Sequence, residues 1–331
     1  MTEAKDKGGD PRTILVYVGL DLVGDATMKL PFIHGLRQAF PQARITWLAG
    51  KGKTVFADLM APLVADAIDE VIDDADIGSR WGELARRPLA GRSFDLIIDT
   101  QRRVLTTLIL RRVRHRRFIS GAAGFWLSDA APPGRHRPKG MARQLAQLLS
   151  LAKGADVTWS GRIAVAAADA DLARRLLPDG ATYVGFAPGA GMEIKRWPLE
   201  SYIATARAQV AAGRVPVFLL GPAEGGLVDA VRAQLPEALL PLQEIDAVTP
   251  ARTIALVQRM AAAVANDCGA GHLMAAAGAP MVSLFGPTPA EKFAPAATRL
   301  MVLKAQIWGG PEMERIPVDA VRDALEGLLP A

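Results

Sequence analysis

The residues best suited to chemistry lie in glycine-containing stretches that each separate a predicted strand from a predicted helix. The most informative is residues 266–272 (NDCGAGH), which follow a short apolar segment in the second half of the chain. This position predicts a helix N-terminus at the carboxyl end of a strand, where unpaired N–H groups and the helix dipole attract anions. Gly269 and Gly271 would let these amides approach a phosphate, and the Asp267 carboxylate would accept hydrogen bonds from sugar hydroxyls. A glycine turn that only caps a helix is the alternative interpretation.

Two further loops of the same kind accompany this stretch. Residues 188–198 (PGAGMEIKRWP) combine a glycine loop with the adjacent cations Lys195 and Arg196, which suits a diphosphate. Residues 221–224 (GPAE) end another predicted strand and offer Glu224 to the hydroxyls of a ribose. Because the carboxyl ends of parallel strands meet at one edge of a sheet, the three loops predict a site for a nucleoside diphosphate. The chain has neither a three-glycine dinucleotide fingerprint nor a phosphate loop ending in Gly-Lys-Ser/Thr.

A single carboxylate in the first half of the chain is a candidate general base. Asp25 follows Val23 and Gly24, where a loop ends and a helix is predicted to begin. A carboxylate in this position can accept a proton from a substrate hydroxyl that comes within hydrogen-bond reach. Capping of the helix is the alternative role for a lone aspartate here, and the two roles are compatible.

The positive charge of the chain is concentrated in its first half. The first 168 residues carry 25 Lys+Arg and 17 Asp+Glu, whereas the remaining residues carry 14 and 17. Most of the excess lies in residues 111–117 (RRVRHRR), with Arg135, Arg137 and Lys139 downstream. An anionic acceptor, an anionic membrane surface and a merely solvated face all fit this run, whereas nucleic-acid binding would favour interleaved aromatic residues.

Composition and spacing exclude several other classes of protein. Half of the 331 residues are apolar, which excludes a largely disordered chain, and the single cysteine, Cys268, excludes a disulfide scaffold. The four histidines show no metal-ligand spacing, so we expect no metal site. No apolar run reaches the roughly 20 residues of a membrane span, and the polar N-terminus lacks a signal-peptide segment. We therefore expect a cytosolic protein with a disordered lead-in.

Short apolar runs alternate with helical patterns along both halves, which predicts two α/β domains with parallel sheets. The predicted strands are residues 13–18, 45–48, 71–72, 94–98, 117–119, 183–187, 216–220, 263–265 and 281–285. The predicted helices are residues 26–40, 104–113, 199–212, 226–234, 252–261, 272–277 and 318–329. An Ala-rich segment at about residues 155–180 breaks the alternation and predicts a linker followed by a helix.

Taken in order, these motifs resemble those of glycosyltransferase family 9, which includes the heptosyltransferases of the lipopolysaccharide inner core. The resemblance covers about residues 12–296 and rests on Gly24-Asp25, residues 195–198 (KRWP), residues 267–272 (DCGAGH) and residues 283–289 (SLFGPTP). It implies a GT-B fold, in which two Rossmann-like domains with parallel sheets face a central cleft. It also implies an inverting transfer without metal or cofactor, which moves a sugar, typically heptose from ADP-heptose, to a lipid-linked acceptor.

The resemblance also implies a division of the chain into four segments. Residues 1–11 would be a disordered tail, and residues 12–168 an acceptor-binding Rossmann-like domain. Residues 169–315 would be the domain that binds the nucleotide-sugar donor. Residues 316–331 would form a C-terminal helix that crosses back to the first domain.

Carried over to this sequence, the resemblance makes Asp25 the base that deprotonates the acceptor hydroxyl. The implied donor-binding residues are Lys195 and Arg196 near the diphosphate, Glu224 at the ribose, Asp267 at the sugar hydroxyls, and Cys268, Gly269, Gly271 and His272 around the diphosphate. The expected acceptor-binding residues are Arg111, Arg112, Arg114 and Arg116. Charge that builds on the departing diphosphate explains how backbone amides and Lys195 replace a metal ion. The chain departs from the family pattern at Cys268, where Thr or Ser is usual.

The resulting prediction is a heptosyltransferase-like enzyme that binds a nucleotide sugar and an anionic lipid-linked glycan, without nucleic acid. It would work in the cytoplasm, with peripheral contact to the cytoplasmic face of the inner membrane. A nucleotide-sugar epimerase of the same fold is one alternative, and it would convert the donor without an acceptor. A non-catalytic module that binds a nucleotide sugar or a polyanion is another, and it predicts binding without turnover.

Overall fold

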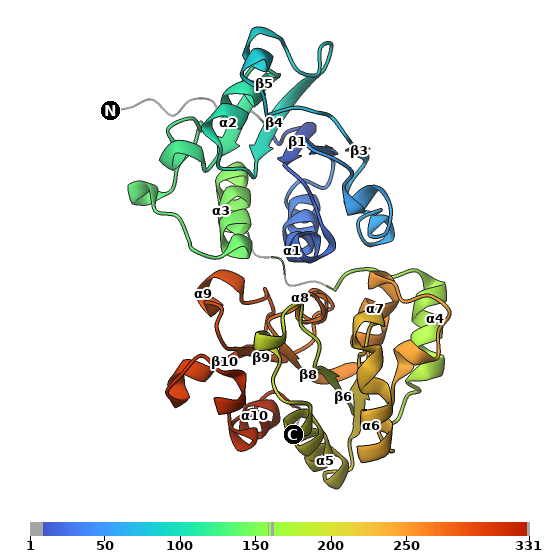
Figure 1. Ribbon diagram of the computed structural model, residues 1–331. Coiled ribbons are helices and arrows are strands. Elements are labelled where there is room, and N and C mark those ends of the chain that lie inside the picture. The colour runs from blue at the N-terminus through green and yellow to red at the C-terminus, as the bar shows by residue number, and fades with distance from the viewer. Residues whose placement is uncertain (1–8, 158, 160–161, 330–331) are drawn as a thin grey trace. The chain divides into compact units, whose positions relative to one another are not determined.

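The chain forms two compact α/β units in a computed structural model that describes residues 9–157, 159 and 162–329 (Figure 1). The first unit is formed mainly by residues before 160 and the second mainly by residues after it. The expected boundary at residue 168 is therefore too late, because α4 (Ala167–Leu176) packs on α7 (Pro250–Val257) of the second unit. Of the expected disordered tail, residues 1–8 lie outside the described residues, and Asp10 accepts a hydrogen bond from Lys153 Nζ at 2.9 Å.

The first unit is built on a parallel sheet with the strand order β3-β2-β1-β4-β5. Its strands are β1 (Thr13–Val18), β2 (Arg44–Ala49), β3 (Glu70–Ile72), β4 (Ser93–Asp99) and β5 (Arg114–Ser120). Its helices are α1 (Val23–Ala39), α2 (Val104–Leu110) and α3 (Met141–Lys153). The central strand β1 is apolar and almost wholly buried, as expected where helices cover both faces. The direction of winding reverses between β1 and β4, and ligands bind beside such a switch point.

The second unit has a parallel sheet with the order β10-β9-β8-β6-β7. Its strands are β6 (Tyr183–Ala187), β7 (Val215–Phe218), β8 (Met260–Asn266), β9 (Met281–Phe285) and β10 (Leu300–Lys304). Besides α4 and α7, its helices are α5 (Leu199–Ala211), α6 (Val228–Gln234), α8 (Gly269–Ala276), α9 (Ala290–Phe293) and α10 (Val318–Glu326). The switch point lies between β6 and β8, so the two most informative loops of the sequence begin on either side of it.

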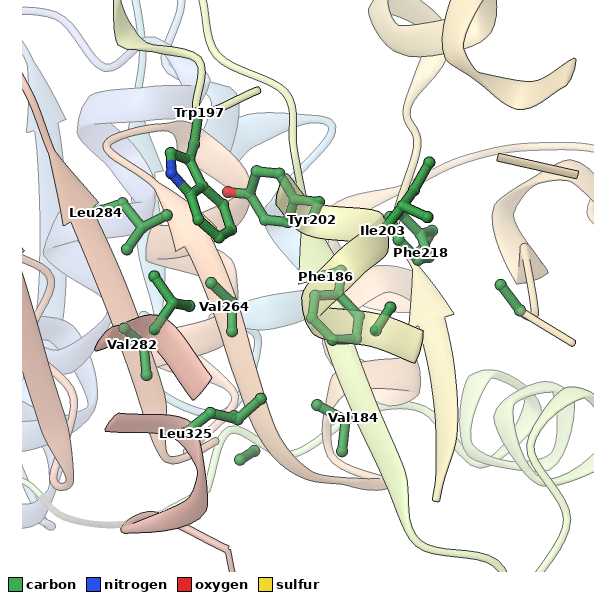
Figure 2. Close-up of a cluster of buried hydrophobic side chains, with 14 of the residues drawn as sticks. Val184, Phe186, Trp197, Tyr202, Ile203, Phe218, Val264, Val282, Leu284 and Leu325 are labelled. Carbon is green, nitrogen blue, oxygen red and sulfur yellow. The ribbon is translucent and has the colours of Figure 1, made fainter. Parts of the chain in front are cut away.

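The C-terminal helix packs in the second unit, and the expectation that it crosses back to the first domain is wrong. Leu325 of α10 is buried in the same apolar cluster as Val282 and Leu284 of β9 (Figure 2). Glu326 accepts a hydrogen bond from Arg214 at 2.6 Å, beside the end of α5. The apolar stripe of α10 therefore has its partner within the second core. None of the described helices is long and apolar enough to cross a bilayer.

The basic run is the main difference between the predicted and observed elements. The pattern predicts a helix over residues 104–113, whereas α2 ends at Leu110 and β5 begins at Arg114. The strand β5 lies at the edge of its sheet. Charged side chains on an edge strand prevent pairing with other chains, which gives this run a structural role.

Candidate functional site

Side chains from three strand ends meet in the second unit. Lys195, in the loop between β6 and α5, places its ammonium 2.8 Å from Oδ2 of Asp267, which directly follows β8. Thr288, after β9, donates its hydroxyl to the same oxygen at 2.7 Å. Among the described residues nothing donates to the other carboxylate oxygen, Oδ1. The Asp267 side chain is 7% exposed and that of Lys195 18%, so the pair is weakly screened and presents one open acceptor.

Asn266 holds two of these loops together. Its Nδ2 donates to the Pro188 carbonyl at 2.8 Å, and its Oδ1 accepts from the Trp197 N–H at 3.2 Å and the Tyr202 hydroxyl at 3.0 Å. The side chain is buried, where each unmade hydrogen bond would be costly. The end of β8 and the loop after β6 are therefore fixed relative to each other by the fold, without a ligand.

Trp197 and Tyr202 form the support under this loop. Their rings pack edge to face with centroids 5.0 Å apart, and both are fully buried in the second core (Figure 2). The Trp197 indole N–H donates to the Ile316 carbonyl at 3.0 Å. Trp197 therefore anchors the loop that carries Lys195 and is not free to stack on a nucleobase.

Glu224 lies directly against the same loop. A Cβ atom at Gly189 would overlap with the Glu224 carboxylate, so a larger residue there would displace this carboxylate from its position against the loop. Glu224 belongs to a short turn after β7, next to β6 in the sheet. This arrangement brings a second carboxylate to the switch-point edge, where it can accept hydrogen bonds from vicinal hydroxyls.

Helix α8 begins immediately after the Lys195–Asp267 pair. Cys268 is its N-cap, and its Sγ accepts the Gly271 N–H at 3.4 Å. A Cβ atom on Gly271 would lie 3.1 Å from the Asn266 carbonyl oxygen, so glycine allows the helix to start close to β8. Within the described part of the chain, the N–H of Gly269 has no acceptor. A helix N-terminus with a free amide beside a lysine is suited to bind a diphosphate.

Burial sets the protonation of two side chains at this helix start. It raises the pKa of the Cys268 thiol to about 11, and the charges of Asp267 and Glu224 act in the same direction. Burial lowers the pKa of His272, although the Asp267 charge opposes this. The thiol and the imidazole are therefore neutral near pH 7 and do not supply charge to an anion. No cluster of three or more His, Cys, Asp or Glu side chains in the described residues is arranged to hold a metal ion.

Two other predicted residues, Arg196 and Asp25, form no hydrogen bond or ion pair with the described cluster of Lys195, Asp267 and Thr288. The Arg196 guanidinium donates to the Ala190 carbonyl at 3.1 and 3.3 Å, so it braces the loop from within. Asp25 lies in the first turn of α1, and Leu22 is the N-cap. The capping alternative for Asp25 is thus not realised, and its carboxylate accepts no hydrogen bond from any residue that the structure describes.

The position of the basic run does not support its expected role in acceptor binding. Arg114 and Arg116 lie at the start of β5. They are therefore at the amino ends of the strands, whereas ligands bind at the carboxyl ends. Arg116 lies 3.6 Å from Asp95, and Arg111 donates to the Leu127 carbonyl at 2.7 Å. These contacts are structural, and Arg112 occupies the short turn between α2 and β5.

Three residues that complete the donor-side cluster were missed by sequence reasoning as functional residues. Thr288 lies within the SLFGPTP stretch, Asn266 precedes the predicted sugar-binding aspartate, and Gly189 lies within the glycine loop. Their positions in motifs were visible, but their partners lie 21 or more residues away in the chain. Only the folded structure identifies which groups they contact.

Comparison with known proteins gives one family match. A family model described as glycosyltransferase family 9 (heptosyltransferase) matches residues 83–318. Over 128 residues the chain is 30% identical to lipooligosaccharide heptosyltransferase 2 of Haemophilus influenzae. This segment covers 37% of the chain and 36% of that protein, so the match spans about a third of the curated relative.

Solved structures show similarity over nearly the whole chain. A glycosyl transferase family 9 structure from Veillonella parvula has a TM-score of 0.69 and 20% identity, and the match covers 96% of this chain and 97% of that one. E. coli ADP-heptose LPS heptosyltransferase II has a TM-score of 0.64 and 21% identity, and the match covers 96% of this chain and 98% of that one. E. coli heptosyltransferase WaaC with ADP has a TM-score of 0.66 and 18% identity, and the match covers 95% of this chain and 99% of that one. At these identities the similarity concerns the fold.

Proposed function

Because the chain belongs to glycosyltransferase family 9, the heptosyltransferase family, we propose that it transfers a heptose from ADP-heptose to a lipid-linked glycan of the lipopolysaccharide core. The observation that carries this proposal is the cluster of Lys195, Asp267 and Thr288 at the start of α8. The names of the relatives described above support the choice of donor and acceptor. The proposed place of work is the cytoplasmic face of the inner membrane.

The donor is proposed to bind along the switch-point edge of the second sheet. The diphosphate lies at the N-terminus of α8, where the amide of Gly269 and the ammonium of Lys195 neutralise its charge. Glu224 accepts hydrogen bonds from the ribose hydroxyls. The open Oδ1 of Asp267 accepts a hydrogen bond from a hydroxyl of the transferred sugar, while Lys195 and Thr288 hold Oδ2. Hydrogen bonds within the protein hold Asp267 in place, which reduces the ordering that binding requires.

The proposed chemistry is a single displacement with inversion. Asp25 accepts the proton of the acceptor hydroxyl as its oxygen forms a bond to the anomeric carbon. The bond from that carbon to the diphosphate breaks, and the electron pair leaves with ADP. Negative charge then grows on the diphosphate, where the α8 amides and Lys195 are fixed in advance. In this proposal these groups take the part that a metal ion plays in other transferases, and no cofactor is required.

Calorimetry with a panel of nucleotide sugars tests the donor assignment. We expect ADP-heptose to bind more tightly than UDP- or GDP-sugars. Lys195→Met should weaken ADP-heptose binding by about 10- to 100-fold, the usual range for a lost charged hydrogen bond. The matched control is Lys304→Met, which removes an exposed lysine that pairs with Glu291, and it should leave binding unchanged. If the protein binds UDP- or GDP-sugars but not ADP-heptose, its donor belongs to another glycan pathway and the proposal is contradicted.

The requirement for an acceptor distinguishes the proposed transferase from the alternative, a nucleotide-sugar epimerase. A transferase releases ADP in proportion to acceptor added, whereas an epimerase converts the donor without one. ADP-heptose is incubated with the protein, once alone and once with a lipid-linked glycan of the lipopolysaccharide core. Analysis of the products then distinguishes a transferase from an epimerase. We expect ADP release with the acceptor and an unchanged sugar without it.

A further inference from the structure

An aromatic ring lies next to the lysine of the donor cluster. Phe293 is the last residue of α9, the short helix that follows Thr288. The Lys195 ammonium lies 5.8 Å from the centroid of the Phe293 ring and 2.8 Å from Oδ2 of Asp267. The lysine therefore has both a carboxylate and an aromatic ring as neighbours, and the proposed function gives the ring no task.

The distance and the burial of this contact fit a cation–π interaction. An ammonium within about 6 Å of a ring centroid is attracted by the negative face of the ring. The attraction is stronger where water is excluded, and the Lys195 side chain is only 18% exposed. The Phe293 ring, which is half-buried, therefore faces a cation that solvent screens weakly.

A second ammonium lies over the same ring. Lys292 precedes Phe293 in α9, and its Nζ is 4.9 Å from the ring centroid. Lys292 is exposed, so water screens its charge. Of the two lysines, Lys195 is the one that also contacts Asp267. The contact with Lys195 therefore connects the ring to the donor cluster.

The loop that carries Phe293 is fixed at the same cluster. Thr288 donates its hydroxyl to Oδ2 of Asp267 at 2.7 Å. Ala290, the first residue of α9, is buried and anchors the start of the helix. One loop therefore holds the carboxylate through Thr288 and faces the ammonium with Phe293.

A lysine side chain is flexible, and holding it in one geometry for an anion costs rotamer freedom. The hydrogen bond to Asp267 restrains the Lys195 ammonium from one direction, and the ring restrains it from a second. A side chain that is fixed before the ligand arrives loses less freedom on binding. For one such side chain this effect corresponds to about 2- to 10-fold in affinity.

We infer that Phe293 is a positioning residue, which holds the Lys195 ammonium beside Asp267 through a cation–π interaction and so prepares it for the diphosphate. The inference rests on the proposed function, because it assigns a task within donor binding. Phe293 acts through Lys195 in this role and has no part in the proton transfer.

Fluorinated phenylalanines at position 293 test this role, because ring fluorines weaken the negative face of the ring with little change in its shape. With one, two and three fluorines, we expect the affinity for ADP in calorimetry to fall stepwise, by about 2- to 10-fold in total. Phe293→Leu should lose at least as much, and Phe293→Tyr, which keeps the ring, should bind as the parent chain does. The matched control is the same series at Phe40, whose ring lies 4.8 Å from the Lys153 ammonium in the first unit, and it should leave ADP affinity unchanged.

A second measurement requires no ligand. In protein with isotope-labelled lysine, the ring current of Phe293 should shift the ε-proton resonance of Lys195 upfield, and Lys195→Met assigns this resonance by its loss. Phe293→Leu should return it to the position of an exposed lysine. An unshifted resonance in the parent chain, or an ADP affinity that does not respond to fluorination, would overturn the inference. Absence of ADP binding in the parent chain would instead contradict the proposed function, and the lysine resonance would still test the contact.

Discussion

Asp267 uses one carboxylate oxygen for the protein and leaves the other for a ligand. Lys195 and Thr288 both donate to Oδ2, at 2.8 and 2.7 Å, which fixes the side chain and neutralises much of its charge. The same lysine faces the proposed diphosphate, so it connects the two parts of the donor. In the proposed function, one hydrogen-bonded cluster therefore recognises both the sugar and the leaving group.

This arrangement predicts different effects on ADP and on ADP-heptose. Asp267→Asn preserves the size of the side chain but removes its charge and one hydrogen-bond acceptor. We expect ADP-heptose to bind about 10- to 100-fold more weakly, because a charged hydrogen bond to the sugar is lost. The affinity for ADP, which has no such sugar, should change less than threefold, and calorimetry with both ligands measures the ratio. Equal losses for the two ligands would contradict the assignment of Asp267 to the sugar.

At this scale the sequence predicted the residues whose chemistry is visible in a local motif. Lys195, Glu224 and Asp267 stand at predicted strand ends, and the structure brings them to one edge of the second sheet. Asn266 and Thr288 were not predicted, because their roles depend on partners 78 and 21 residues away. A polar residue in a motif does not itself show whether it binds a ligand or a neighbouring loop.

The loops after β6 and β8 act as one element because Asn266 joins them. Asn266→Ala would leave the Trp197 N–H and the Pro188 carbonyl without a buried partner, and the Tyr202 hydroxyl with only its 3.3 Å bond to the Ala187 carbonyl. We expect the free energy of unfolding to fall by about 2–4 kcal/mol in urea titrations. ADP affinity should also fall, because the Lys195 loop loses its anchor. A variant as stable as the parent chain would contradict this role.

Asp99, at the end of β4, makes the stability of the first unit depend on pH. Burial raises its pKa to about 6, although hydroxyls of Thr107 and Ser120 stabilise its charge. Between about pH 4 and pH 6 the folded state therefore binds more protons than the unfolded state, so stability falls as pH rises. The contribution is about 3 kcal/mol over this window.

The variant Asp99→Asn removes this titration. Urea unfolding at pH 4.5, 5.5, 6.5 and 7.5 should show a smaller loss of stability with rising pH than in the parent chain. Above about pH 6 the two curves should run parallel, since the carboxylate is then ionised in both states. Parallel curves over the whole range would show that Asp99 ionises as it does in the unfolded chain.

Predicted elements agree best where the strands are apolar and bounded by turn residues. β1, β6 and β9 have the predicted limits. The helix predicted over residues 104–113 is too long and the strand predicted over residues 117–119 too short, because pairing with β4 extends the edge strand to Arg114–Ser120. α3 and β10 were not predicted; β10 is an edge strand of five residues, none of them buried, so it lacks the buried apolar character of the predicted strands.

At the scale of the molecule, the prediction of a GT-B fold with two parallel-sheet units is confirmed. The limits of the units were less predictable, because α4 and α10 both pack with the second core. Part of the charge excess of the first half is the run at residues 111–117, which belongs to an edge strand and the turn before it.

The two units have separate tasks in the proposed reaction. The second unit is proposed to bind the donor, through amides and few charges. Asp25, at the start of α1, is proposed to remove the acceptor proton. Donor binding and transfer should therefore be separable by a single substitution at this residue.

The central claim is tested most directly by measuring ADP-heptose affinity and acceptor-dependent ADP release in Asp25→Asn. This substitution keeps the shape of the side chain and removes the base. We expect the affinity to stay within twofold of the parent chain and the transfer rate to fall by about 10²- to 10⁴-fold, the usual contribution of a general base. Transfer at the parent rate, or loss of donor binding together with transfer, would contradict the account.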